Sequence, residues 1–159
     1  MSENDVEAQP HGSTTVSRSV KAAPQRVWAE LADAWMYPVW LVGATHIRDV
    51  DPEWPAVGSK LHHSVGPWPV SVSDTTEVLA AEAPHRLTLR ARAWPAGEAR
   101  VEIVIDEDGS GSRMTMTEGP LRGPARWVHN PIQRWLLKQR NVESLNRLAT
   151  VVEKRPMST

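Results

Sequence analysis

A single stretch near the C-terminus, residues 131–154, most constrains the fold of this chain. Its sequence is PIQRWLLKQRNVESLNRLATVVEK, in which apolar residues recur at steps of three and four. This period places one apolar stripe along an α-helix and a charged face opposite it. Twenty-four residues make a helix of roughly 36 Å, long enough to cross a small domain. A second structure must cover the stripe, which consists of Ile132, Trp135, Leu136, Val142, Leu145, Leu148, Ala149 and Val152.

The chain before this helix reads mainly as short β-strands. Apolar and polar residues alternate with the period of half-buried strands. Pro24 suits the first turn of a helix, and Pro38 predicts either a kink or an irregular first turn in a second one. Short turns, such as the Asp108-Gly109 hairpin, favour antiparallel pairing. We therefore predict helices over 24–34 and 35–42, and strands over 14–21, 46–51, 60–65, 70–81, 86–93, 99–106 and 113–119.

Length and composition favour one ordinary soluble domain. The 159 residues include no cysteine, which excludes disulfides, thiolate metal sites and a cysteine nucleophile, and the net charge is −1. No phosphate loop, zinc motif or nucleophile elbow is present, so we expect neither a metal nor a cofactor. The polar N-terminus is not a signal peptide, and no apolar run is long enough for a membrane span. We expect a cytoplasmic protein with a flexible tail at 1–13, a single domain at 14–155 and a short tail at 156–159.

Several motifs resemble one superfamily. They are VKAAPQRVW at residues 20–28, Gly58 before a strand, DGSGSR at 108–113 and RNVESL at 140–145. Together they resemble the START-like (SRPBCC) proteins of the polyketide cyclase/dehydrase group, over residues 16–153. The resemblance implies an α+β helix-grip fold, in which a seven-stranded antiparallel sheet wraps around the C-terminal helix. Two short helices after the first strand would close an apolar cavity. Members bind lipids, aromatic polyketides or hormones, so the resemblance specifies the fold more closely than the function.

The alternation within the strands also indicates which side chains face such a cavity. Small alanines would leave volume there, and flexible methionines would suit variable ligand shapes. Three tryptophans beside loops are candidates for the rim of the cavity, namely Trp40, Trp68 and Trp94. In the other interpretation these residues only touch the helix and leave no sizeable void. The candidate cavity residues are Trp40, His63, Trp68, Leu89, Ala91, Trp94, Val101, Ile103, Met114, Met116, Glu118 and Trp135.

Two candidates carry ionisable groups. His63 is either a general base or hydrogen-bond donor in the pocket, or a satisfied core histidine. It diverges from His62 along the strand, which argues against a shared metal. Glu118, if it faces inward, needs a partner or a proton. It is either half of a structural ion pair with Arg18 on the neighbouring strand, or an acid catalyst. Arg18 is otherwise solvated at a sheet edge.

Three functions remain compatible with these observations. The first is binding of a hydrophobic small molecule, a lipid or an aromatic polyketide, between sheet and helix. The second is a polyketide cyclase or dehydratase that uses the same pocket, with His63 and Glu118 moving protons. The third is a surface adaptor that docks through the basic C-terminal helix, where residues 121–155 carry eight Lys or Arg and two Glu. We expect no nucleic-acid partner, because aromatic residues do not interleave with the basic ones on that face. We expect at most a weak membrane-surface contact, because a charged helix face is usually only solvated.

Overall fold

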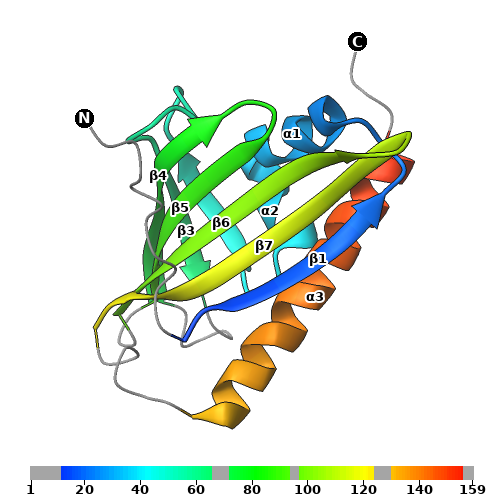
Figure 1. The fold of residues 1–159 in the computed structure, drawn as a ribbon. Coiled ribbons are helices and arrows are strands. Elements are labelled where there is room, and N and C mark those ends of the chain that lie inside the picture. Colours follow the sequence, from blue (N-terminus) through cyan, green and yellow to red (C-terminus); the bar gives the residue numbers. More distant parts are fainter. Residues whose placement is uncertain (1–11, 66–71, 94–96, 124–129, 156–159) are drawn as a thin grey trace, which may run out of the picture.

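The protein consists of a strongly curved antiparallel sheet with helices packed against one face (Figure 1). The structure is a computed structural model and describes residues 12–65, 72–93, 97–123 and 130–155. The helical segments are α1 (Pro24–Ala32), the 3-10 turn η1 (Ala34–Met36), α2 (Tyr37–Trp40) and α3 (Pro131–Lys154). The strands are β1 (Thr14–Val20), β2 (His46–Val50), β3 (Lys60–Val65), β4 (Val72–Glu82), β5 (Arg86–Ala93), β6 (Gly97–Asp108) and β7 (Gly111–Arg122).

The sheet has the order β1-β7-β6-β5-β4-β3-β2, and every neighbouring pair is antiparallel. Strands β2 to β7 pair with their neighbours along the chain, whereas β1 pairs with β7 at the far edge. This arrangement confirms the predicted seven-stranded helix-grip fold. Figure 1 shows α3 lying across the sheet beside β1, with α1 and α2 near its C-terminal part.

The strands β6 and β7 are longer than predicted. Their hairpin turn is only two residues long, because Gly109 adopts a φ of 61° and the pairing continues to Asp108 and Gly111. Register shifts occur in two other strands. One lies in β4 between Val78 and Ala80, and the other lies in the edge strand β2 between Ile47 and Asp49. Residues 70 and 71 of the predicted fourth strand lie outside the described part of the chain.

The predicted second helix is divided in two. Instead of one helix over 35–42, the chain forms η1 and then α2, which has Pro38 in its first turn. Proline has no backbone N–H to bond back to the preceding turn, so a new helix begins there instead. Tyr37 packs against Trp40 and Trp54, with ring centroids 4.7 and 5.7 Å apart. The short helices are thus held by an aromatic cluster next to the sheet.

The helix α3 has the predicted bounds, but only its C-terminal half is covered. The Asn130 side chain caps the helix by accepting a hydrogen bond from the N–H of Ile132 at 2.9 Å. The prediction that the whole apolar stripe is buried is wrong, because the helix is longer than the surface on which it packs. Its first turns extend past the sheet (Figure 1). Leu145, Leu148, Ala149 and Val152 are buried, whereas Ile132, Trp135 and Leu136 are 65%, 58% and 54% exposed.

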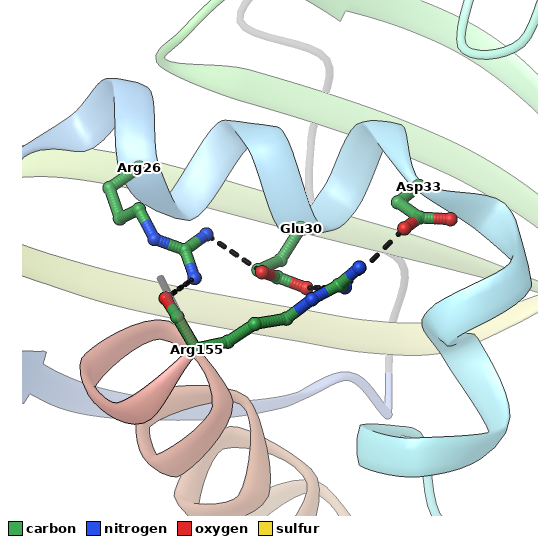
Figure 2. Close-up of polar contacts among 4 residues, drawn as sticks. All are labelled: Arg26, Glu30, Asp33 and Arg155. Carbon is green, nitrogen blue, oxygen red and sulfur yellow. Dashed lines mark hydrogen bonds and ion pairs between the residues drawn. The ribbon is translucent and has the colours of Figure 1, made fainter. Parts of the chain in front are cut away.

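A group of charged residues joins the end of α3 to α1 (Figure 2). We call Arg26, Glu30, Asp33 and Arg155 the Glu30 cluster. Arg26 donates to Glu30 Oε1 at 2.7 Å and to the carbonyl oxygen of Arg155 at 2.6 Å. Arg155 Nη1 lies 3.3 Å from Glu30 Oε2 and 3.4 Å from Asp33 Oδ2. Because Glu30 is only 3% exposed, this buried carboxylate has two cationic partners and fixes the two helices together.

Candidate functional site

A cavity of about 150 Å³ opens between the sheet, the short helices and α3. Most of its wall is apolar. Eight of the candidate residues from the sequence line it, namely Trp40, His63, Leu89, Ala91, Val101, Ile103, Met116 and Glu118. Residues that the sequence did not suggest also contribute, among them Tyr37, Leu41, Thr76, Ala99 and Arg140.

The cavity follows from alternation in the central strands. In β5 and β6, every second residue faces the helices, and Leu89 lies opposite Val101 in the ladder. Ala91 lies opposite Ala99, so two methyl groups stand where larger side chains would meet. This pair of small residues leaves part of the cavity volume unfilled.

His63 lies in the wall at the side of β3 and β4. The residue is 8% exposed, and its Nε2 lies 3.0 Å from Thr76 Oγ1 on the neighbouring strand. Burial lowers the pKa of the His63 imidazole below its ordinary value of 6.5, although the charge of Asp74 acts in the opposite direction. The imidazole is therefore neutral at pH 7. Nδ1 is buried and has no hydrogen-bond partner among the described residues.

Glu118 is buried, but its partner is Arg140 rather than Arg18. Arg140 Nη2 on α3 donates to Glu118 Oε2 at 2.5 Å, and both residues line the cavity. Arg18 lies opposite Met114 in the β1–β7 ladder and is exposed, so the predicted Arg18–Glu118 pair is wrong and the solvated alternative holds. Thr14 is the residue opposite Glu118. The helix that crosses the sheet, not the adjacent strand, supplies the positive charge.

A backbone contact holds the loop after α2 at the cavity. The N–H of Val42 donates to Ser144 Oγ at 3.1 Å, and this hydroxyl donates in turn to the carbonyl oxygen of Arg140 at 2.9 Å. Val42 lines the cavity, and Ser144 is fully buried on α3. The loop and the Arg140 turn of α3 are thereby tied together at one side of the cavity.

The remaining candidates lie elsewhere. Met114 is buried in the core and does not line the cavity, and Trp135 is exposed on the uncovered turns of α3, so both positions in the predicted wall are corrected. Trp68 and Trp94 lie outside the described residues. Trp40 is fully buried in the wall rather than at a rim, and its Nε1 has no hydrogen-bond partner among the described residues.

Arg140 is a site residue that the sequence analysis missed, although the sequence carries a signal for it. Residues four apart on a helix share a face. Arg140, Ser144, Leu148 and Val152 form such a series, and the last three are buried. The face of α3 that packs against the core therefore continues through Arg140 to the cavity.

Comparison with known proteins identifies the family. The family model described as polyketide cyclase / dehydrase and lipid transport matches residues 11–153. The chain belongs to this family. Membership in the polyketide cyclase/dehydrase and lipid transport family confirms the resemblance seen in the sequence. Among curated proteins, none matches this chain.

Solved structures share the fold of this polyketide cyclase/dehydrase family member. A Rhodobacter sphaeroides protein has a TM-score of 0.70 and 21% identity, covering 91% of this chain and 95% of that one. Ara h 8.0201 has a TM-score of 0.69 and 10% identity, covering 88% and 96%. The di-domain ARO/CYC BexL from the BE-7585A biosynthetic pathway has a TM-score of 0.68 and 15% identity, covering 91% of this chain and 50% of that one. At these identities, the likeness concerns the fold alone.

Two features of other protein classes are absent from the described part of this family member. It contains no group of three or more His, Asp or Glu residues that could hold a metal ion. None of the helices within it is long and apolar enough to cross a membrane.

Proposed function

We propose that the protein binds a hydrophobic small molecule, a lipid or an aromatic polyketide-like compound, in the cavity between sheet and α3. The observation that carries this proposal is the cavity itself, which has an apolar wall and a few polar groups. The name of the family, which includes both polyketide cyclases and lipid transport, agrees with this chemistry. Burial of apolar ligand surface supplies the affinity, at about 25 cal/mol per Å² before the costs of association.

The size of the cavity limits what it holds. Drug-sized ligands occupy sites of about 300–1,000 Å³, and an apolar cavity of about 150 Å³ binds benzene. The present volume is also about 150 Å³. The enclosed part therefore takes a ring or a short acyl segment, and a longer ligand extends through the opening.

A cavity-filling variant tests this function. Native mass spectrometry of freshly purified protein asks whether a ligand is carried, and calorimetric titration with the small neutral probe 1-naphthol measures binding to the cavity. Ala91→Leu, which fills the space opposite Ala99, is expected to weaken probe binding by about tenfold or more. Ala29→Leu on the exposed side of α1 is the matched control and keeps wild-type affinity. Equal affinities for wild-type and Ala91→Leu would show that the probe binds elsewhere.

A second candidate function is cyclase or dehydratase catalysis in the same cavity, and His63 is the observation that favours it. A neutral, buried imidazole with a free Nδ1 can accept a proton from a carbon that lies between two ketones. The resulting enolate carbon attacks another ketone of the same chain, and loss of water then gives an aromatic ring. Glu118 is paired with Arg140, so the pair would orient substrate oxygens rather than act as a free acid.

Product analysis distinguishes this candidate from a carrier. A short synthetic poly-β-ketone is incubated with the protein, and the ring products are compared with those formed in buffer alone. Catalysis by His63 predicts that His63→Gln returns the products to the buffer distribution. His62→Gln, on the opposite side of β3 near Asp51, is the matched control. A product distribution unchanged by wild-type protein would favour the carrier.

A third candidate function, docking to a membrane surface, follows from the uncovered turns of α3. Ile132, Trp135 and Leu136 are exposed there beside exposed Arg134 and Lys138, and the sequence has no acidic residue from 131 to 142. Exposed aromatic and aliphatic residues flanked by basic ones are typical of helices that lie at an anionic lipid surface.

Co-sedimentation with vesicles tests the docking candidate. Binding to phosphatidylserine-containing vesicles, its absence with pure phosphatidylcholine and its weakening by salt are the expected results. Trp135→Ala should reduce binding, whereas Trp35→Ala, at an equally exposed tryptophan on η1, should not. Equal loss in the two variants would remove α3 as the docking element.

A further inference from the structure

The ion pair of Glu118 and Arg140 joins the sheet to α3 in the wall of the cavity. Both residues line the cavity, and Arg140 Nη2 donates to Glu118 Oε2 at 2.5 Å. Residues directly opposite each other in an antiparallel ladder share a face of the sheet. Glu118 lies opposite Val101, which also lines the cavity, so the Glu118 side chain is on the cavity face of β7. The Arg140 guanidinium, which reaches this carboxylate from α3, therefore lies at the same side of the cavity.

Arg140 has both accessible surface and hydrogen-bonding capacity to offer a ligand. Its side chain is 38% exposed, whereas that of Glu118 is 8% exposed. A guanidinium has five N–H donors. Nη2 donates to Glu118, and Nε and Nη2 each lie 3.3 Å from Asn141 Oδ1. These contacts with described residues hold the guanidinium in one orientation and leave the two N–H groups of Nη1 for a ligand that enters the cavity.

An apolar floor adjoins this donor. Val101, beside the ion pair, lies opposite Leu89 in the ladder, and Ala99 lies opposite Ala91 two residues further along the same strands. All four residues line the cavity, and the two alanines leave the space that a ring can occupy. A ligand whose ring lies on this floor can direct an oxygen atom attached to the ring toward the guanidinium.

The carboxylate of Glu118 determines which kind of ligand oxygen suits the arginine. Its negative charge already balances the positive charge of Arg140, so a ligand carboxylate would bring a second negative charge beside a buried one. Like charges repel more strongly in a site of low dielectric, and burial also removes their hydration. A carbonyl oxygen accepts from the guanidinium without this cost. An ammonium group fits no better, because the donors of Arg140 cannot bind it.

We infer that the Glu118–Arg140 pair selects a neutral ligand with a carbonyl oxygen next to an apolar ring. Arg140 binds the oxygen atom, and Glu118 excludes carboxylates. The inference rests on the proposed ligand-binding function, and it adds the chemical class of the ligand and the residue that sets charge selectivity. When glutamine replaces Glu118, Arg140 keeps its positive charge without a balancing carboxylate, so the site should then accept anions.

Three probes of nearly the same shape test the inference. Acetophenone carries a carbonyl oxygen beside a benzene ring, α-methylstyrene has a methylene group in place of that oxygen, and benzoate carries a carboxylate. Their dissociation constants are measured at pH 7 by NMR titration of isotope-labelled protein, which detects weak binding. Ratios of these constants are compared between proteins, because the probes also differ in their transfer from water.

Glu118→Gln tests the exclusion of carboxylates and keeps the shape of the side chain. The ratio of the benzoate constant to the acetophenone constant is expected to fall by about tenfold or more in this variant. Glu143→Gln, at an exposed carboxylate of α3 that pairs with Arg147, is the matched control and keeps the wild-type ratio. A purely structural role of Glu118 would weaken both probes alike, so an unchanged ratio overturns the inference.

Arg140→Met tests the contact with the oxygen atom. It is made together with Glu118→Gln, so that no buried carboxylate is left unpaired, and it is compared with Glu118→Gln alone. The preference for acetophenone over α-methylstyrene should fall by about tenfold. Arg147→Met in the same background is the control and should leave this preference unchanged. An equal preference with and without Arg140 overturns its role in binding oxygen.

A further measurement uses only the wild-type protein. The Nε–H resonance of Arg140 should move more with acetophenone than with α-methylstyrene, and equal movement would contradict the inference. Failure of wild-type protein to bind any of the three probes overturns both the inference and the proposed function. Binding of the probes with ratios that no variant changes overturns the inference alone.

Discussion

Arg140 on α3 donates to the buried carboxylate of Glu118 on β7 and so ties the helix to the sheet beside the cavity. The Glu118 side chain is 8% exposed, whereas that of Arg140 is 38% exposed. Removal of Arg140 would leave the buried Glu118 carboxylate in a mostly apolar wall without its cationic partner. This pair therefore contributes both to the packing of α3 against the sheet and to the electrostatic character of the cavity.

Replacement of Arg140 should destabilise the protein more than replacement of Arg18. Arg140→Leu leaves the Glu118 carboxylate without its cation, and we expect the free energy of unfolding to fall by about 1–2 kcal/mol. Arg18→Leu, at an exposed position, should change it by less than about 0.5 kcal/mol. Urea denaturation measures both. The double variant Arg140→Leu/Glu118→Gln should recover part of the loss, and a larger effect of Arg18→Leu would contradict the assignment.

Glu30 and Glu143 provide a matched comparison of two ion pairs with the same spacing. Arg26–Glu30 has side chains 13% and 4% exposed, whereas Arg147–Glu143 has side chains 47% and 51% exposed. Glu30→Gln should lower the free energy of unfolding by about 1–3 kcal/mol, because two arginines lose a buried partner. Glu143→Gln should change it by less than about 0.5 kcal/mol. Similar losses in urea melts of the two variants would mean that burial does not set the strength of the Glu30 cluster.

Two leucines of α3 should differ in how much their replacement by alanine destabilises the protein. Leu148 is fully buried, whereas Leu136 is 54% exposed three turns earlier. Leu148→Ala should cost about 2–5 kcal/mol. The free energy of unfolding of Leu136→Ala should lie within about 0.5 kcal/mol of wild type, because little packing is lost. Thermal denaturation of the two variants checks this. A large loss for Leu136→Ala would show that the first turns of the helix are covered in solution.

Burial of His63 should make stability depend on pH. The pKa of its imidazole is lowered in the folded state, so the unfolded chain binds a proton more readily. The stabilising contribution is fully present above the unfolded value of about 6.5 and is lost as pH falls from there toward the lowered value. We expect the free energy of unfolding, measured by urea denaturation at several pH values, to fall less steeply from pH 7 to pH 5 for His63→Gln than for wild type. Parallel curves would indicate that this imidazole is not desolvated.

Much of the fold could be predicted because local signals coincide with its boundaries. The bounds of β3, β5 and α3 were predicted correctly, and α3 begins where Asn130 and Pro131 provide a cap and a first-turn residue. The ends of β6 and β7 were missed because backbone pairing continues through polar residues that show no apolar alternation. The segment 35–42 is not one continuous helix, because Pro38 lies in the first turn of α2 and the 3-10 turn η1 precedes it, which agrees with the expected irregular first turn rather than with a kink.

The site was predicted less completely, for a geometric reason. Alternation in β5 and β6 identifies the side of each strand that faces the helices, and Leu89, Ala91, Val101 and Ile103 line the cavity accordingly. The period of a helix identifies its apolar stripe but not how much of that stripe the sheet reaches. Trp135 was misplaced for this reason.

The edge strand β2 also affects how readily molecules of this protein associate through their sheets. A sheet that does not close into a barrel ends in strands with unpaired N–H and C=O groups, which can template pairing with another chain and lead to aggregation. Here β2 is only five residues long, and its register shifts between Ile47 and Asp49. A short, irregular border offers few consecutive bonds to an incoming strand, and it limits growth of the sheet from molecule to molecule.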